Sequence, residues 1–227
     1  MAVPTAHRIR LALENAIVDG AHQPGDRIDP NRIAADYACS RTPVREALQA
    51  LEASGLVQVQ PKRGTFVTTL GITDLMHRFE LMAEMEALCA RLACRRAGSA
   101  DHARIAQSLT ACEIAAKAED SDRYYAENTL FHQAIYHAAH NPFLEEETLR
   151  LQAVLQPYRR CQLQARGRLA TSLREHRIIA QAIRDGDADA ASAATTEHVL
   201  VQGERFRDLV ALLESFGRND ADLISGN

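Results

Sequence analysis

The chain has 227 residues, a formal net charge of −4 at pH 7 and a hydrophobic content of 46%, which suits one large or two modest globular domains with a sizeable core. No apolar run is long enough to cross a bilayer, which excludes a helical membrane protein. The five cysteines include no C-x-x-C spacing and no secretory signal begins the chain, so we expect reduced thiols and a cytoplasmic protein.

Residues 7–38 predict two helices separated by a turn. Residues 7–19 place their apolar side chains on one face of an amphipathic helix. Gly25 followed by Arg27 and Ile28 predicts a turn and a short strand. The second helix has a buried stripe at the i, i+3, i+4 spacing, formed by Ile33, Ala34, Tyr37 and Ala38.

The next helix carries the residues that say most about function. Ser40 and Thr42 are suited to its cap, Pro43 is tolerated at its first position, and Val44, Ala47, Leu48 and Leu51 form its core stripe. Two short helices joined by a tight turn make a helix-turn-helix, whose second helix enters the major groove of DNA. An Arg there can bond guanine, and a Thr can reach phosphate. The predicted DNA contacts are Ser40, Arg41, Thr42, Arg45 and Gln49.

A predicted β-hairpin follows this helix. Two β-prone runs, 56–60 and 65–69, flank the turn Pro61–Gly64. The pattern predicts a winged helix with a basic wing tip on the DNA backbone or minor groove, so Lys62, Arg63 and Gly64 join the predicted contacts. The alternative is that the arginines of the helix and the cations of the turn are ordinary solvated charges.

Beyond a linker at 71–73 the strand signals end. We therefore predict a mainly α protein: a winged helix-turn-helix domain at 5–70, an all-α bundle of about six helices at 74–214, and a flexible tail at 215–227. The predicted helices of the bundle span residues 74–97, 103–118, 122–139, 143–163, 169–185 and 187–213. A Gly at 186 separates the last two as a helix end, and Pro157 is expected to kink the fourth.

Three histidines of the bundle stand on core faces. His132 lies four residues after Asn128, and His176 and His198 likewise share their faces with apolar residues. Neutral imidazole is the commonest metal ligand, and a buried trio suits Zn²⁺ or a similar divalent ion with open positions. The alternative is that each is a hydrogen-bonded core residue. His137 and His140 lie off this face and are expected at the surface or a helix end.

Residues 5–70 resemble the DNA-binding domain of the GntR family of bacterial transcription regulators. The resemblance is carried by Pro24–Ile28, Ser40–Leu48, Gly55–Val57 and Arg63–Val67. It implies a regulator that binds a palindromic operator in double-stranded DNA. Asn31 departs from the pattern because many relatives have an Arg there, so a backbone contact from this position is expected to be weaker or different.

The bundle is similar to the metal-containing type of the FadR C-terminal (FCD) ligand-binding domain. Asn128-x-x-Phe-His132, Glu175-His176 and Glu197-His198 carry this resemblance. It implies the metal ligands Asn128, His132, His176 and His198, with zinc the expected ion and nickel or manganese as alternatives. A neutral Asn replaces the usual carboxylate, so metal affinity is expected to be lower, or a bound acid to supply the missing negative charge.

The resemblance also implies a homodimer and a small carboxylic acid as effector. Many relatives have an Arg where this chain has Met82, so the effector contact is left open. Candidates are Arg78, Arg159, Arg160 and Tyr136, although the tyrosines of the bundle equally suit packing. We predict a regulator, by family default a repressor, and no enzyme. The alternatives are a metal-only sensor and, more distantly, a zinc-dependent hydrolase, which would need a general base near the metal.

Charge supports a dimer. Residues 1–70 carry 8 Lys/Arg and 7 Asp/Glu, and residues 71–227 carry 18 and 23. An acidic bulk repels DNA, so binding must depend on local placement of cations. We therefore expect modest affinity from one protomer and a need for two.

Overall fold

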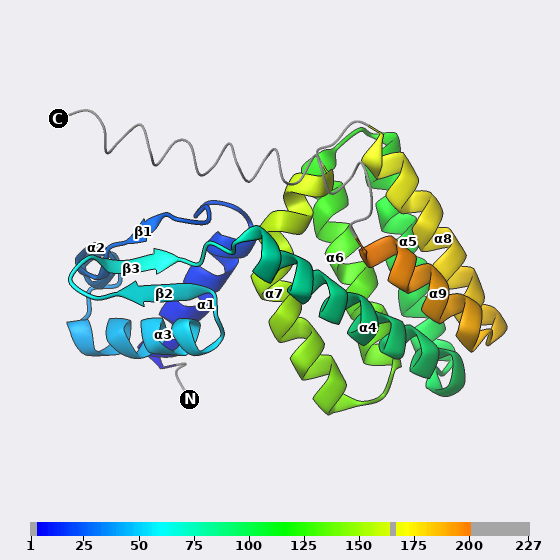
Figure 1. Ribbon diagram of the computed structural model, residues 1–227, viewed down its shortest axis with the longest axis horizontal. Coiled ribbons are helices and arrows are strands. Elements are labelled where there is room, and N and C mark those ends of the chain that lie inside the picture. The colour runs from blue at the N-terminus through cyan, green and yellow to red at the C-terminus, as the bar shows by residue number, and fades with distance from the viewer. Residues whose placement is uncertain (1–3, 164–166, 201–227) are drawn as a thin grey trace. The chain divides into compact units, whose positions relative to one another are not determined.

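The computed structural model describes residues 4–163 and 167–200. Side chains are described for residues 4–160 and 167–200. The chain divides into two compact units, one made of the residues up to Gly71 with the short segment Ala153–Pro157, and the other made of the residues from Ile72 without that segment. Each unit has its own set of buried apolar residues. The predicted fold class is confirmed: the chain is mostly helical, with one small sheet in the first unit (Figure 1).

The first unit combines three helices with a three-stranded sheet. The sheet is antiparallel, in the order β1-β3-β2, and its first strand is the predicted short one. Apolar residues from every helix and strand meet in one core beneath it. The elements are α1 (Thr5–Val18), β1 (Arg27–Ile28), α2 (Pro30–Asp36), α3 (Arg41–Ala53), β2 (Val57–Gln60) and β3 (Gly64–Val67).

The turn between α2 and α3 differs from the sequence prediction. α2 ends at Asp36, and Ala38 adopts a left-handed conformation with φ of 47°. This reversal takes Tyr37 and Ala38 out of the helix, so Ala38 is exposed and does not extend the buried stripe. The prediction of that stripe was wrong beyond Ile33, because a left-handed residue ends an α-helix.

Helix α3 begins two residues before the predicted start. Ser40 is its N-cap residue but makes no side-chain cap hydrogen bond, and Arg41 is its first residue. Pro43 therefore stands third, where its missing N–H is still among the four that a helix leaves unbonded. The predicted stripe of Val44, Ala47, Leu48 and Leu51 is buried, which fixes the opposite face of α3 toward solvent.

The second unit is an array of helices without a strand in its described part. Left-handed glycines flank α8, with φ of 75° at Gly167 and 74° at Gly186, so the predicted helix end at Gly186 is confirmed. α7 continues through Pro157. The helices are α4 (Ile72–Arg96), α5 (Ser99–Lys117), α6 (Ser121–Ala138), α7 (Pro142–Leu163), α8 (Arg168–Asp185) and α9 (Ala188–Val199).

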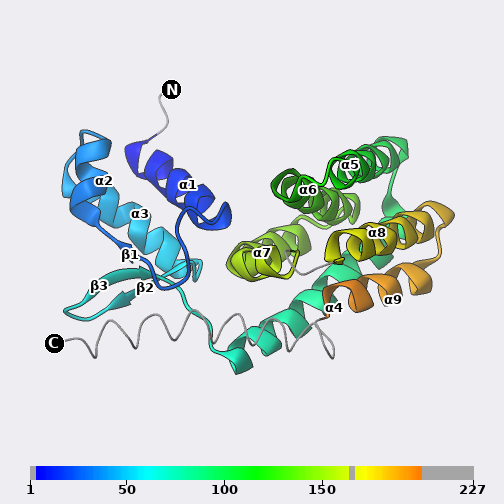
Figure 2. The same cartoon turned by 90° about the horizontal axis from the view of Figure 1, so that it is seen from above.

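Four of these helices enclose the interior that matters for function. α4 packs against α6, α8 and α9, and α8 packs against α9. Figure 2 shows α4 running beneath the ends of α8 and α9. The predicted helix at 187–213 is represented by α9; its residues beyond 200, and the predicted tail at 215–227, lie outside the described residues. Within the described ranges, the helices are too short or too polar to cross a membrane.

Candidate metal centre and nucleic-acid interface

The outward face of α3 presents polar side chains to solvent. Arg41, Thr42, Arg45 and Gln49 are exposed, and so is Ser40 at the helix start. A pocket with a volume of about 550 Å³ is lined by all of these residues except Ser40. Residues of β2 and β3 form its other wall. Within residues 4–163 and 167–200 no carboxylate forms an ion pair with Arg41 or Arg45. These cations are therefore free to meet phosphates or bases.

The wing tip is a tight turn between β2 and β3. Its backbone is left-handed at Lys62, with φ of 64°, and at Gly64, with φ of 119°. A Cβ at Gly64 would lie 3.3 Å from Nε of Arg27, so the turn needs glycine for its conformation and for space. Lys62 and Arg63 are exposed, and the Arg63 guanidinium lies 5.9 Å from the Phe66 ring centre. The turn thus holds two cations outward.

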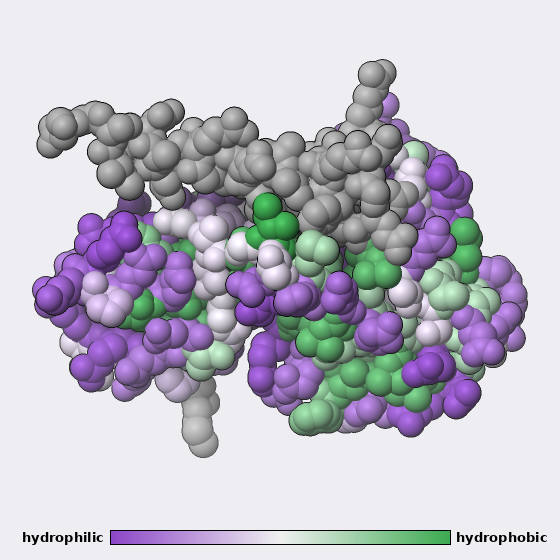
Figure 3. Space-filling view, viewed as in Figure 1, coloured by the Kyte–Doolittle hydropathy of each residue, from purple (hydrophilic) through white to green (hydrophobic). Residues whose placement is uncertain are grey.

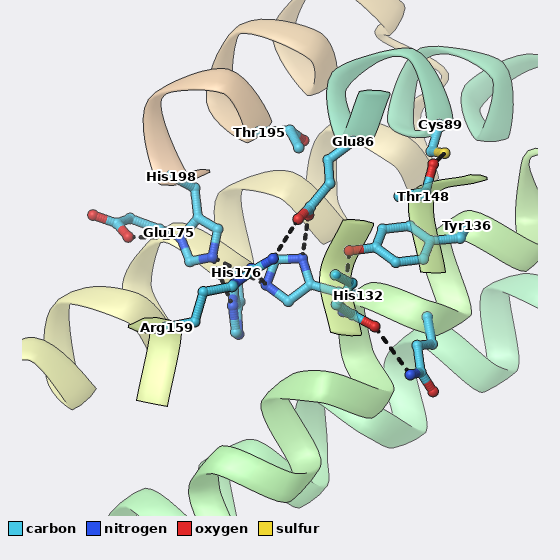
Figure 4. Close-up of polar contacts among 12 residues, drawn as sticks. Glu86, Cys89, His132, Tyr136, Thr148, Arg159, Glu175, His176, Thr195 and His198 are labelled. Atoms are coloured by element: carbon cyan, nitrogen blue, oxygen red, sulfur yellow. Dashed lines mark hydrogen bonds and ion pairs between the residues drawn. The ribbon is translucent and has the colours of Figure 1, made fainter. Parts of the chain in front are cut away.

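The three bundle histidines meet inside the second unit. His132 comes from α6, His176 from α8 and His198 from α9, and each is at most 6% exposed. Nε2 of His198 lies 3.1 Å from Nε2 of His132 and 3.3 Å from Nε2 of His176. All three ligand atoms lie within 4.8 Å of one another. Figure 4 shows the rings converging on one point.

This spacing fits a divalent ion. Zinc lies about 2.0–2.1 Å from imidazole nitrogen, so tetrahedral geometry separates two ligand nitrogens by about 3.4 Å. The two shorter separations are close to that value. Burial lowers the pKa of His132 and His176 below the ordinary range, and lowers that of His198 to about 4 although Glu175 opposes the shift. All three rings are thus neutral near pH 7, the form that binds metal.

Two carboxylates hold the outer nitrogens of these rings. Nδ1 of His132 lies 2.6 Å from Glu86 of α4, and Nδ1 of His198 lies 2.7 Å from Glu175 of α8. A carboxylate on Nδ1 fixes the proton there and turns the Nε2 lone pair inward, as in carboxylate–histidine–metal arrangements. Burial alone would raise the pKa of both carboxyls, but their cationic and imidazole partners outweigh it, holding Glu175 at about 2 and Glu86 well below its usual range.

Each carboxylate also pairs with an arginine. Arg159 of α7 donates to Glu86 at 2.6 Å and to Nε2 of His132 at 3.2 Å, while Arg168 donates to Glu175 at 2.7 Å. Arg159 is 9% exposed. Burial would lower its pKa, but Glu86 reverses that and raises it, so Arg159 remains a cation.

Polar groups beside the triad lack good hydrogen bonds. Within the described residues, four buried atoms have no partner in proper hydrogen-bond geometry: Oε2 of Glu86, Nδ1 of His176 and the hydroxyls of Tyr124 and Ser172. Ser172 stands one turn before His176 on α8, and the Tyr124 ring is stacked on that imidazole with centroids 6.5 Å apart. Burial raises the Tyr124 pKa, and the nearby Ser172 hydroxyl offsets part of the rise. Buried polar groups of this kind mark a place where a ligand or water completes the bonding.

The remaining predicted site residues are placed as follows. Asn128 is buried on α6 one turn before His132, on the same helix face. The Tyr136 hydroxyl accepts from Gln152 at 3.2 Å. Arg78 is half-buried on α4. Arg160 pairs with Asp122 and lies over a tyrosine ring, so of the three arginine candidates it is Arg159 that the structure brings to the histidines.

The two histidines predicted to lie off the core face do so. The His137 side chain is 46% exposed and lies 3.3 Å from Glu145. The His140 side chain is 49% exposed, stands just after α6 and lies 2.8 Å from Asp101. Neither belongs to the cluster of His132, His176 and His198.

Comparison with protein families accounts for both units. Residues 5–67 match the model "Bacterial regulatory proteins, gntR family". Residues 77–200, more than half of the chain, match the model "FCD domain". The chain belongs to the GntR family. It is a transcriptional regulator with an N-terminal helix-turn-helix domain and a C-terminal FCD domain, as the sequence resemblance implied.

Relatives are similar over nearly the whole length. The galactonate operon transcriptional repressor of Escherichia coli K12 is 25% identical over 92% of this chain and 100% of its own. A probable D-xylose utilization operon transcriptional repressor of Paenarthrobacter nicotinovorans is 29% identical, covering 86% and 85%. The solved structure of E. coli McbR/YncC has a TM-score of 0.77 at 23% identity, covering 94% of this chain and 99% of that one, and so shows the shared fold.

Within this FCD domain, sequence reasoning missed the residues that surround the triad. Adjacent positions on a helix differ by about 100°, so Glu175 does not share the ligand face of His176. It does point away from His176, but toward His198 on the neighbouring helix. Glu86 and Arg159 are 73 positions apart and still in contact. The one signal in the sequence for these contacts is that Glu86 stands among the apolar residues of α4 that face the core. A carboxylate is seldom buried without a partner.

Proposed function

We propose that this GntR-family regulator is a dimeric repressor whose operator affinity is set by a small organic acid bound beside a divalent metal in the FCD domain. The observation that carries the proposal is the convergence of three neutral imidazole nitrogens, with carboxylates on the outer nitrogens of two rings. This donor set suits zinc, with nickel or manganese as alternatives.

Four residues would hold the metal: His132, His176 and His198, with Asn128 as a fourth ligand from α6. When bound, the metal supplies a positive charge that attracts and orients a carboxylate. Glu86 and Glu175 keep the rings in the binding tautomer and orientation. Arg159 is the cation for the acid, because its guanidinium lies at the triad and can donate a hydrogen bond to a carboxylate.

The DNA-binding part of the proposal rests on α3 and the wing. Arg41, Thr42, Arg45 and Gln49 line a concave surface, and Lys62 and Arg63 lie at an exposed turn. Recognition helices place such residues at base edges and wings place theirs at the backbone. Ser40 and Gly64 would contribute at the helix start and in the turn. Relatives named as operon repressors support repression over activation.

The dimer is supported by apolar surface on the second unit. Met76 and Leu81 of α4 are 41% and 55% exposed, and Phe143 of α7 is 74% exposed. In Figure 3 hydrophobic patches appear over the helices of this unit, whereas the visible face of the first unit is mostly hydrophilic. Large apolar side chains on the surface are available to an interface between protomers. A two-fold dimer would read a palindromic operator, one half-site for each protomer.

The switch would be a shift between two arrangements of the DNA-binding domains. An acid that binds one arrangement more tightly changes operator affinity by that difference in affinity. One relative is named for an operon of galactonate, a sugar acid, which supports an acid as the class of effector. A hydrolase is disfavoured because Glu175 faces Nδ1 of His198, on the side of the ring away from the metal-facing nitrogen, and so offers no general base there.

The proposal is tested by isolating the operator directly. Selection from random duplexes would yield a binding site, and fluorescence anisotropy would then measure affinity for it with zinc alone and with zinc plus acids including D-galactonate. We expect a palindrome, and weaker binding with at least one acid. A response to zinc alone would instead indicate a metal-only sensor, and the absence of any preferred duplex would refute the regulator.

A further inference from the structure

Nε2 of His132 can serve either as a metal ligand or as a hydrogen-bond acceptor for Arg159. Nε2 of His132 points at the metal position, yet it also lies 3.2 Å from the Arg159 guanidinium. Arginine only donates hydrogen bonds, so this nitrogen must be the acceptor and Nδ1, facing Glu86, must carry the proton. A single lone pair can accept from Arg159 or bind a metal, but not both.

The charges around the triad also disfavour a metal ion that binds without an anion. The three imidazoles are neutral, and Asn128 brings no charge where a carboxylate would. Glu86 is balanced by Arg159 and Glu175 by Arg168. A divalent ion added to this interior would carry an uncompensated double positive charge close to a buried arginine, which is unfavourable in a medium of low dielectric. A carboxylate that enters with the ion reduces the excess charge from +2 to +1.

We infer that the metal and a carboxylate bind to this site as a pair, and that Arg159 is the residue that couples them. The inference rests on the proposed function and adds that binding of the metal depends on binding of the acid. Without an acid, one guanidinium nitrogen of Arg159 occupies the lone pair of His132 while another holds Glu86. With an acid, the first nitrogen donates to the acid's carboxylate, Nε2 of His132 is released, and the pair with Glu86 remains.

Arg168 provides a matched control. Like Arg159 it is an arginine in an ion pair with a carboxylate that holds a triad histidine. Unlike Arg159, it makes no hydrogen bond to a triad nitrogen among the contacts of the described residues. Replacing Arg168 therefore removes a nearby positive charge without freeing a ligand lone pair.

The experiment measures zinc affinity by isothermal titration calorimetry on the metal-stripped full chain, with and without millimolar acetate, for wild type, Arg159→Met and Arg168→Met. Acetate is the probe because it is a small, stable carboxylate that binds zinc only weakly in water. We expect acetate to raise wild-type zinc affinity about tenfold, within the usual range of coupling between two ligands. Arg159→Met should bind zinc more tightly than wild type without acetate and lose the acetate effect, whereas Arg168→Met should retain it.

Two outcomes overturn the inference while leaving the metal centre in place: wild-type zinc affinity that is independent of acetate, or an undiminished acetate effect in Arg159→Met. Zinc binding absent from the wild type under both conditions would overturn the proposed metal centre itself. Circular dichroism checks that each variant is folded. If Arg159→Met does not fold, Arg159→Gln takes its place, and an undiminished acetate effect in that variant overturns the role of Arg159.

Discussion

The arginines of the two candidate sites, one site in each unit, differ in burial and in pairing. In the first unit Arg41 and Arg45 are exposed and carry no carboxylate partner among the described residues. In the second, Arg159 and Arg168 are largely buried, and each is paired with a glutamate that also holds a histidine. An exposed, unpaired cation is available to a large partner outside the chain, whereas a buried, paired one is available only to a ligand small enough to enter the interior. In the proposed function, the first unit binds the DNA polyanion and the second responds to a small ion.

The largest effect is expected from the triad. Replacing His132 and His176 together with Ala should remove bound metal entirely, because one imidazole cannot hold a divalent ion in an open interior site. Elemental analysis of the purified protein measures this. His137→Ala is the control, since His137 is an exposed imidazole outside the cluster. Metal content that is unchanged in the double variant would show that the ion binds elsewhere.

The next effect is expected from the recognition helix. Arg45→Ala should lower affinity for the selected operator about 100-fold, because one bidentate Arg contact to guanine is worth about 1–3 kcal/mol and a dimer makes it twice. Anisotropy on operator and on random duplex measures the loss of preference. Arg150→Ala, an exposed arginine of α7, should bind like wild type. Equal operator binding by wild type and Arg45→Ala would remove Arg45 from the interface.

A smaller effect is expected from the carboxylate of α8. Glu175→Gln keeps the size of the side chain but weakens its hold on Nδ1 of His198, so zinc affinity should fall about tenfold, as for other residues that orient a metal-binding histidine. Calorimetry measures it. Glu113→Gln is the control, because Glu113 pairs with Arg177 at the protein surface. Unchanged zinc affinity would mean that Glu175 does not orient His198.

The smallest effect is a pH dependence of the metal-free protein. Burial lowers the pKa of His198 from 6.5 to about 4, against a smaller opposing effect of Glu175, and lowers those of His132 and His176. Below pH 6.5 the unfolded chain binds protons that the folded chain does not, so stability is complete above pH 6.5 and is lost as pH falls toward 4. Urea unfolding at several pH values measures this. Constant stability across that window would contradict the lowered pKa values.

The fold and the triad could be predicted because both follow from local periodicity. Val44, Ala47, Leu48 and Leu51 share one helix face, and each bundle histidine stands among apolar neighbours on its own helix. Facing a common core was enough to bring three such histidines together. The predicted buried stripe was wrong at Ala38, because an alanine side chain gives no sign of the left-handed backbone that ends α2.

The surroundings of the triad could not be predicted in the same way. Glu86, Arg159 and His132 come from three helices, and their contact depends on the rotation and crossing of those helices. Periodicity gives the face of a helix but not its neighbour in a bundle. For this reason the sequence offers Arg159 only as one of several candidate effector contacts. The structure shows that its guanidinium lies 3.2 Å from Nε2 of His132.

Native mass spectrometry of the protein as purified is the most direct test of the sensing site. The account predicts a protomer that carries one divalent ion together with one small organic acid, and the loss of both in the variant with Ala at positions 132 and 176. A protein that shows only its bare mass, even after incubation with zinc and acetate, would contradict the account.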